Sequence, residues 1–198
     1  MSSEVKSICV YCGAAAGARP AYAEAARELG RRMAEAGIRL VYGGGKVGLM
    51  GIVADAVLAH GGQAIGIIPK ALVDKEVGHT GLTELHVVEN MHQRKQKMAD
   101  LSDAFIAMPG GIGTCEELFE VFTWLQIGYH AKPIGLLNVE HYYDPLMVFL
   151  NAMVTEQFLK GAQLDQLQVA TSPEALLETI QRFKPSQIDR WAKQRTQI

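Results

Sequence analysis

Short, nearly continuous apolar runs alternate with longer helix-like segments along most of this chain. Two of the runs, residues 38–42 and 63–68, are rich in β-branched side chains and carry few polar ones. Such strands are typical of a parallel sheet that helices cover on both faces, because neither face meets water. The repeated β-α-β order therefore predicts an α/β fold: one doubly wound, Rossmann-like domain with a mostly parallel sheet flanked by helices.

The expected elements follow this order from residue 7 to about residue 183. We expect strands at residues 7–11, 38–42, 63–68, 84–88, 104–108, 133–137 and 167–170. We expect helices at residues 20–36, 48–60, 91–101, 115–127, 144–155 and 173–182. A chain of 198 residues can bury one sizeable core, so residues 1–198 are assigned to a single domain with a polar tail from about 184. Residues 69–83 lack a regular pattern, which is typical of a lid or flap.

Charge and composition argue against several classes of function. The formal net charge is −2, so no broad positive field attracts nucleic acid or an anionic membrane. No apolar run reaches the roughly 18 residues that span a bilayer, and the polar start lacks a secretory signal pattern. Three cysteines without framework spacing fit a reducing compartment. We therefore expect a cytoplasmic protein that binds neither nucleic acid nor membrane.

Cys9 and Cys12 form a C-x-x-C pair, which in other proteins can be a redox or zinc motif. Here Cys9 lies inside the expected first strand and not at a helix N-terminus, and no second pair completes a zinc site. We interpret both cysteines as small apolar side chains of the core. The six histidines show no metal-ligand spacing, so we expect no metal.

The strongest candidate site is Pro109-Gly-Gly-Ile-Gly-Thr114, between an expected strand and an expected helix. In this 109–114 loop, glycines allow the backbone close to a ligand, and the helix start supplies unpaired N–H groups and positive dipole charge. The competing interpretation is a tight turn that needs glycine only for its dihedral angles. Three glycines within four residues exceed what one turn requires, so we favour a phosphate site.

A second glycine-rich loop, Gly43-Gly-Gly-Lys-Val-Gly48, matches G-x-G-x-x-G between a strand and a helix. A dinucleotide site would also need an acidic residue at the end of the next strand, where this chain has Ile68-Pro-Lys70. A P-loop would need Ser or Thr after Lys46, where this chain has Val47. This 43–48 loop therefore predicts close backbone approach to a ligand, but not NAD. The residues expected to approach it are Gly43, Gly44 and Gly45.

The segment Asn90-Met-His-Gln-Arg-Lys95 opens the helix that precedes the 109–114 loop. Asn90 and Gln93 have the spacing of a capping box. Arg94 and Lys95 follow in the first turn, where cations oppose the helix dipole, so an anionic group is expected to compensate them. The alternative is a solvated pair of surface cations.

Glu117 follows the 109–114 loop by about one helical turn, so its carboxylate could reach a sugar whose phosphate that loop holds. Thr114-Cys-Glu-Glu117 is also a capping-box pattern, and a purely structural role is therefore a serious rival. A neighbouring polar stripe at helical spacing comprises Glu116, Glu120 and Thr123.

The same helix is apolar over a wider arc than the roughly 100° stripe that one core needs. The excess predicts a helix that also packs against a second subunit, and hence a homodimer. The alternative is a central helix buried within one subunit. The apolar residues are Leu118, Phe119, Val121, Phe122, Trp124 and Leu125.

The motif Pro109-Gly-Gly-Ile-Gly-Thr-Cys-Glu-Glu117 resembles P-G-G-x-G-T-x-x-E of the LONELY GUY proteins. These are cytokinin riboside 5′-monophosphate phosphoribohydrolases, which older naming called lysine decarboxylase-like. The resemblance continues in residues 42–51, 90–95 and 132–138, and it covers the chain from residue 7 to about 183. It implies a dimeric Rossmann-like enzyme that needs no cofactor and releases the base from nucleoside 5′-monophosphates.

By motif position, the resemblance implies that Arg94 and Glu117 are the catalytic pair. It implies substrate-binding positions at Glu76, Lys95, Gly110, Gly111, Gly113, Thr114 and Thr123. Family members often carry serines after the first strand, where this chain has Ala14, Ala15 and Ala16. The affinity and the preferred base therefore stay open, since adenine, N6-isopentenyladenine and another base are all compatible with a pose anchored by the phosphate.

Hydrolysis at C1′ passes through an oxocarbenium-like state. We expect an ionised Glu117, aided by Arg94, to stabilise that charge and orient water. Arg94 would stabilise negative charge on the phosphate or the departing base. Lysine decarboxylation would instead need pyridoxal phosphate on a lysine and a partner for its ring nitrogen, for which this short chain has no identifiable pattern. A nucleotide-binding regulator or carrier without turnover is the remaining alternative.

Overall fold

The computed structural model describes residues 4–73 and 78–184. The strands in these residues are β1 (Ser7–Tyr11), β2 (Arg39–Tyr42), β3 (Ala64–Pro69), β4 (Glu84–Val88), β5 (Ala104–Ala107), β6 (Ile134–Leu137) and β7 (Leu167–Ala170). The helices are α1 (Pro20–Glu35), α2 (Gly48–Ala59), α3 (Lys70–Val73), α4 (Met91–Asp100), α5 (Ile112–Gln126), α6 (Asp144–Thr155), α7 (Gly161–Leu164) and α8 (Pro173–Arg182), with a 3-10 turn η1 (Val139–His141).

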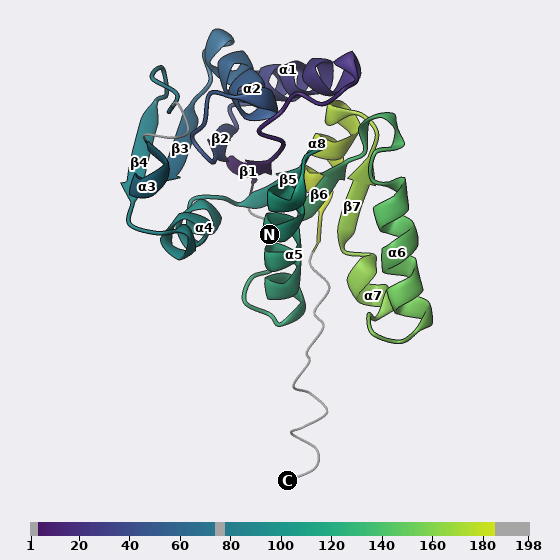
Figure 1. Ribbon diagram of the computed structural model, residues 1–198. Helices are drawn as coiled ribbons and strands as arrows, with labels where there is room; N and C mark the ends of the chain where they lie inside the picture. The colour runs from purple at the N-terminus through teal and green to yellow at the C-terminus, as the bar shows by residue number, and fades with distance from the viewer. Residues whose placement is uncertain (1–3, 74–77, 185–198) are drawn as a thin grey trace.

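The seven strands form one sheet in the order β4-β3-β2-β1-β5-β6-β7, and every strand pair in it is parallel. The predicted fold class is therefore confirmed, and this sheet is parallel throughout. Strand order reverses between β1 and β5, so the chain winds outward from the centre of the sheet in both directions (Figure 1). In such sheets a ligand binds beyond the carboxyl ends of the strands at this switch point.

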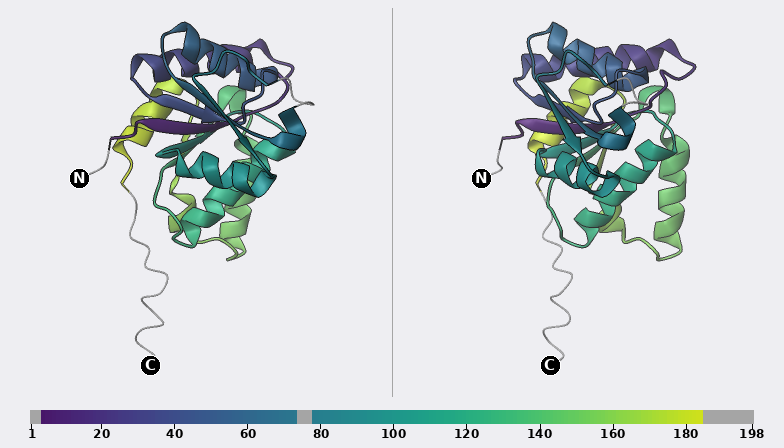
Figure 2. Two further views of the ribbon diagram at one scale, coloured as in Figure 1. Left: turned by 90° about the vertical axis from the view of Figure 1, so that its left-hand side faces the viewer. Right: turned by 60° about the vertical axis from the view of Figure 1, so that its left-hand side comes forward.

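Two apolar cores lie on opposite faces of the sheet, because successive strand residues point to opposite sides. In β1, Ile8 and Val10 belong to the core under α1, α2 and α8, whereas Cys9 and Tyr11 belong to the core under α4, α5, α6 and α7. Figure 2 shows these two helical layers with the sheet between them. The two cores thus cover both faces of the sheet and leave the strand ends as the places where loops from both layers meet.

The thiols of Cys9 and Cys12 are buried and free. Burial raises the pKa of both thiols far above the ordinary value, so both stay protonated at neutral pH. Thiolates, not thiols, carry redox chemistry and bind metals. The prediction that these cysteines fill the core is confirmed.

Helix α5 begins at Ile112, three residues before the predicted start at residue 115. Its N-cap is Gly111, which has extended backbone angles, and no side chain caps the helix. The predicted capping box of Thr114 and Glu117 is therefore wrong, because Thr114 already lies in the first helical turn. The structural alternative for Glu117 is thus removed, and its carboxyl is available for other contacts.

The segment predicted as a lid contains the short helix α3, which four residues are too few to reveal by periodicity. Beyond it, Gly78 pairs with Gly45 in an isolated antiparallel bridge. Residues 78–79 therefore lie against the 43–48 loop. The predicted polar tail from about residue 184 lies almost entirely outside the described residues.

The wide apolar arc of α5 is largely used within the chain. Leu118, Val121, Phe122 and Leu125 are buried in the core beneath the helix. Phe119 and Trp124 pack against that core but stay partly exposed. One subunit thus accounts for most of the arc. No helix among residues 4–73 and 78–184 has the length and apolar character to cross a membrane.

Candidate active site

Three loops meet at the carboxyl ends of β2, β1 and β5. The loop after β1 joins the other two, because the Gly13 N–H donates to the Pro109 carbonyl at 3.1 Å and the Gly13 carbonyl accepts from the Leu49 N–H at 3.0 Å. A cavity of about 330 Å³ opens at this junction. Its lining includes Gly13, Ala14, Ala15, Ala16, Gly17, Tyr22, Leu49, Pro109, Gly110, Gly111 and Tyr142.

The 109–114 loop is packed so tightly that Gly110 cannot carry a side chain in place. A Cβ on Gly110 would overlap the buried Thr114 side chain and lie 2.9 Å from the Gly13 nitrogen. By contrast, Gly111 and Gly113 have nothing within 4 Å of an added Cβ. Of the three glycines, Gly110 lets two loops touch, while Gly111 and Gly113 face open space where a ligand could approach.

Two consecutive tyrosines bind carbonyl groups in this loop and just before it. The Tyr142 hydroxyl donates to the Gly110 carbonyl at 2.5 Å, and the Tyr143 hydroxyl donates to the Met108 carbonyl at 2.6 Å. The first N–H groups of a helix have no acceptor within that helix. The N-terminal N–H groups of α5 therefore have the character of an anion-binding helix start.

Arg94 of α4 is buried and held by backbone carbonyls from two strand ends. Its Nε–H donates to the Ile67 carbonyl at 3.1 Å, and its Nη2 donates to the Gly43 carbonyl at 3.4 Å. A Cβ on Gly43 would overlap the guanidinium, so glycine at this position lets Arg94 lie flat on the loop. The remaining nitrogen, Nη1, lies 4.0 Å from Glu117 Oε1.

Glu117 faces Arg94 from the second turn of α5, with only 14% of its side chain exposed. Burial raises the pKa of this carboxyl to about 7, and the attraction of Arg94 offsets only part of the effect. Arg94 therefore keeps Glu117 only partly ionised at neutral pH in the free protein, less than the sequence led us to expect. At neutral pH the carboxyl is divided between its two protonation states, which is the condition that suits proton transfer.

Lys95 ties α4 to α5. Its Nζ lies 2.6 Å from Glu116 Oε1 and 2.9 Å from Glu120 Oε1, and 13% of its side chain is exposed. Burial lowers the pKa of Lys95, but its two carboxylate partners outweigh burial and bring the pKa above the ordinary value. The anionic compensation expected for Arg94 and Lys95 thus comes from α5, and the alternative of a solvated pair is wrong.

Asn90 caps α4 as expected: its side chain accepts from the Gln93 N–H at 2.9 Å. The Gln93 side chain reaches back to the Glu89 N–H at 3.0 Å, one residue earlier than the usual capping box. The cap fixes where α4 begins and therefore where Arg94 points.

The structure gathers most of the predicted site residues but not all of them. The gathered set is Gly43, Gly44, Gly45, Arg94, Lys95, Gly110, Gly111, Gly113, Thr114 and Glu117. Thr123 is exposed near the far end of α5, roughly 18 Å along the helix from Gly111 by the α-helical rise. Glu76 lies outside the described residues.

Glu117→Gln should make the fold more stable above neutral pH, because glutamine avoids the cost of ionising a buried carboxyl. The folded state raises the Glu117 pKa from 4.5 to about 7, so wild-type stability falls as pH rises across that interval. The difference in free energy of unfolding between the variant and the wild type should therefore widen by roughly 1–3 kcal/mol between about pH 5 and about pH 8. Urea unfolding of both proteins measures it, and a gap independent of pH would contradict the burial of this charge.

Gly110→Ala and Gly113→Ala should change stability in opposite directions. Alanine at Gly110 must displace Thr114 or Gly13, which costs roughly 1–3 kcal/mol. Alanine at Gly113 meets open space inside α5 and should stabilise the helix by about 0.5–1 kcal/mol. Denaturant midpoints measure both changes. Equal effects of the two substitutions would show that Gly110 is not packed as described.

Several known proteins are similar to this chain in sequence or in fold. A family model described as "Possible lysine decarboxylase" matches residues 50–180. The cytokinin riboside 5′-monophosphate phosphoribohydrolase LOG of Oryza sativa subsp. japonica is 52% identical over 89% of this chain and 73% of its own length. LOG1 of Arabidopsis thaliana, with the same activity in its name, is 46% identical over 93% of this chain and 87% of its own length.

Among solved structures, a molybdenum cofactor binding protein from Rippkaea orientalis has a TM-score of 0.66 and 26% identity, covering 91% of this chain and 98% of its own. Two relatives of high identity and the match of the family model over most of the chain confirm the resemblance that the motifs predicted. The chain belongs to the LONELY GUY family of cytokinin riboside 5′-monophosphate phosphoribohydrolases.

Proposed function

We propose that this chain hydrolyses the N-glycosidic bond of adenosine 5′-monophosphates, including N6-substituted ones, and releases free base and ribose 5-phosphate. The observation that carries the proposal is the buried Arg94–Glu117 pair, 4.0 Å apart, beside a glycine-rich helix start. The names of the rice and Arabidopsis relatives support the same reaction and the cytokinin class of substrate.

The phosphate is the anchor of the proposed complex. The N–H groups at the start of α5 and the positive end of its dipole hold it, while Gly43, Gly44 and Gly45 let the sugar approach the backbone. Binding energy from the phosphate then positions a bond several atoms away from it. Because this anchor is absent from nucleosides, the proposal requires strong preference for monophosphates.

Glu117 acts on the sugar. Ribose hydroxyl groups that donate to its carboxylate favour the ionised form, so substrate binding counteracts the burial that raises its pKa in the free protein. The carboxylate then stabilises positive charge as it develops at C1′ and orients the attacking water. One residue thus binds the ribose and stabilises the transition state.

Arg94 supplies a fixed positive charge. Two of its nitrogens donate to backbone carbonyls, so the side chain loses little further conformational freedom when the third nitrogen contacts substrate. Arginine does not give up its proton at neutral pH, so its role is to stabilise negative charge on the phosphate or the leaving base. The proposed chemistry needs neither a metal nor an organic cofactor.

Lysine decarboxylation, which the description of the family model suggests, is not the function that we propose. A lysine that binds pyridoxal phosphate must lose its proton to form the Schiff base. Lys95 is held by Glu116 and Glu120, which stabilise its charged form. The lysine at this site is therefore unsuited to that chemistry.

A carrier without turnover is the second candidate. The similarity in fold to the molybdenum cofactor binding protein of Rippkaea orientalis favours it, because that protein's name describes binding. A carrier would use the same loops to hold a nucleotide or another phosphate-bearing ligand. It would not require a carboxyl with a pKa near neutrality opposite Arg94.

We also propose a homodimer and a cytoplasmic location. Partly exposed Phe119 and Trp124 on α5 support a second packing surface there, and three free cysteines support a reducing compartment. Light scattering on the purified protein should give twice the chain mass of 21.6 kDa. A mass equal to one chain at all concentrations would rule out the dimer.

The proposed reaction predicts free base from AMP and from N6-isopentenyl-AMP, and little from either nucleoside. Glu117→Gln should lower kcat by roughly 100-fold or more, because it removes charge stabilisation at C1′. Chromatographic measurement of base release from purified protein checks both predictions.

The matched control is Glu178→Gln, which removes an exposed carboxylate on α8 that pairs only with Arg182 within the described residues; it should act like the wild type. Tight AMP binding without release of base would favour the carrier. Full activity of folded Glu117→Gln would contradict the proposal that Glu117 stabilises charge at C1′.

A further inference from the structure

We propose that His79, held by Asp55, is a positioning residue that fixes the 43–48 loop and, through Gly43, the guanidinium of Arg94. The kinetic consequence rests on the proposed function. The placement of the loop and of Arg94 does not, and it can be measured without turnover.

Both ring nitrogens of His79 are engaged. The Gly81 N–H donates to Nδ1 at 3.1 Å, so Nδ1 carries a lone pair and the proton lies on Nε2. That Nε2–H donates to Asp55 Oδ1 at 2.8 Å. A carboxylate that accepts from one ring nitrogen fixes both the tautomer and the orientation of an imidazole.

The backbone of His79 is paired with the 43–48 loop. The His79 N–H donates to the Gly44 carbonyl at 3.0 Å, and Gly78 bridges Gly45 next to it. With its side chain only 4% exposed, His79 is a buried residue that connects the loop to α2. A loop of consecutive glycines has little stiffness of its own, so contacts of this kind decide where its carbonyls point.

Those carbonyls include the one that receives Arg94. The Gly43 carbonyl accepts from Arg94 Nη2, and the guanidinium occupies the space that a Cβ on Gly43 would need. A chain of contacts therefore runs from Asp55 through His79 and the loop to Arg94. Each link is a hydrogen bond or a direct contact of the loop, so displacement at His79 is passed on to the catalytic pair.

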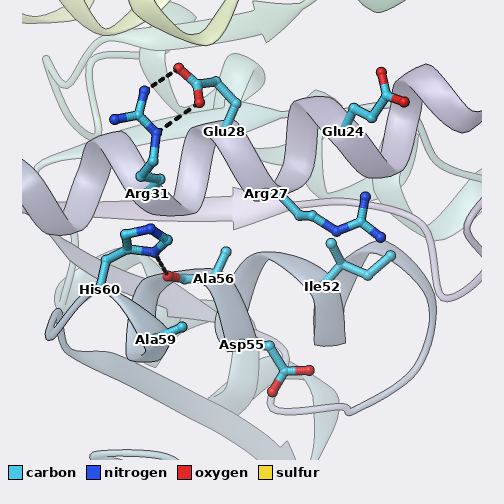
Figure 3. A pocket seen from close by; sticks show the side chains of 9 residues that line it. All are labelled: Glu24, Arg27, Glu28, Arg31, Ile52, Asp55, Ala56, Ala59 and His60. Atoms are coloured by element: carbon cyan, nitrogen blue, oxygen red, sulfur yellow. Dashed lines mark hydrogen bonds and ion pairs between the residues drawn. The ribbon is translucent and has the colours of Figure 1, made fainter.

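Asp55 lies on α2 at the edge of a groove of about 580 Å³ between α1 and α2 (Figure 3). Its side chain is 59% exposed, and Figure 3 shows its carboxylate apart from the Arg31–Glu28 pair on α1. Truncation of Asp55 therefore opens no hole in the core. The truncation is therefore a second way to test the His79–Asp55 contact without removing the buried imidazole.

Three variants separate the contacts. His79→Gln keeps a donor at about the position of Nε2, His79→Asn keeps an acceptor at about the position of Nδ1, and Asp55→Ala removes the carboxylate alone. If the hydrogen bond from His79 to Asp55 positions the loop, His79→Asn and Asp55→Ala should lower kcat for base release by roughly 10–100-fold with little change in KM. His79→Gln should recover most of the activity. Glu24→Ala, on the opposite side of the same groove, is the control and should leave kcat unchanged.

A second readout uses no turnover. The Arg94 Nε–H, which donates to the Ile67 carbonyl, should give a resolved nitrogen–proton NMR signal that Arg94→Lys identifies. His79→Asn and Asp55→Ala should shift this signal while the signals of the other arginine side chains stay in place. If the protein proves not to release base, this shift alone supports the positioning role.

The proposal fails if Asp55→Ala and His79→Asn, both folded, leave the Arg94 signal unmoved. It also fails if His79→Gln and His79→Asn lose activity equally, since the loss would then report disruption of packing and not the bond to Asp55.

Discussion

The site depends on a buried carboxyl that faces a buried guanidinium. Burial alone makes a charged Glu117 costly, and Arg94 at 4.0 Å lowers that cost without cancelling it. A closer, fully hydrogen-bonded ion pair would have kept the carboxyl ionised. At this separation Arg94 offsets only part of the effect of burial, so a group that binds beside Glu117 can change the protonation of its carboxyl.

The parallel sheet makes this arrangement possible. The carboxyl ends of β2, β1 and β5 lie side by side at the switch point, so three loops from distant parts of the chain converge there. Helices α4 and α5 belong to the same layer and bring Arg94 and Glu117 together. Lys95, bound to Glu116 and Glu120, locks the two helices at that spacing. The electrostatics of the site is thus a product of helix packing, not of the loops alone.

The sequence predicted the seven strands and the six longer helices, but not the short elements α3, α7 and η1. It also predicted many of the candidate site residues, because they follow local patterns. Continuous apolar runs identified the strands, and glycine clusters at strand ends identified the loops. Two helix starts, at residues 90–95 and 114–117, singled out Arg94 and Glu117, and the family resemblance implied that they are the catalytic pair. The protonation of Glu117 could not be predicted, because it depends on how deeply α4 and α5 bury the carboxyl. The capping box at Thr114 was predicted wrongly because the N-cap of α5 is Gly111, which has no side chain to signal a cap.

Other contributors have no signal in the sequence at all. Tyr142 and Tyr143 follow the loop that they hold by about thirty residues, and only the pairing of β5 with β6 brings them there. His79 showed no ligand spacing, since its partners are a single carboxylate on α2 and backbone groups.

The most direct test of the account is the pH dependence of kcat/KM for base release from AMP. The account predicts a rate that rises with the ionisation of one group of pKa about 7, and the loss of that dependence in Glu117→Gln. The substrate phosphate also titrates near pH 6, so a thiophosphate analogue, which is a stronger acid, separates the two groups. A profile that follows the analogue's own pKa, or that survives Glu117→Gln unchanged, would contradict the central role of the Arg94–Glu117 pair.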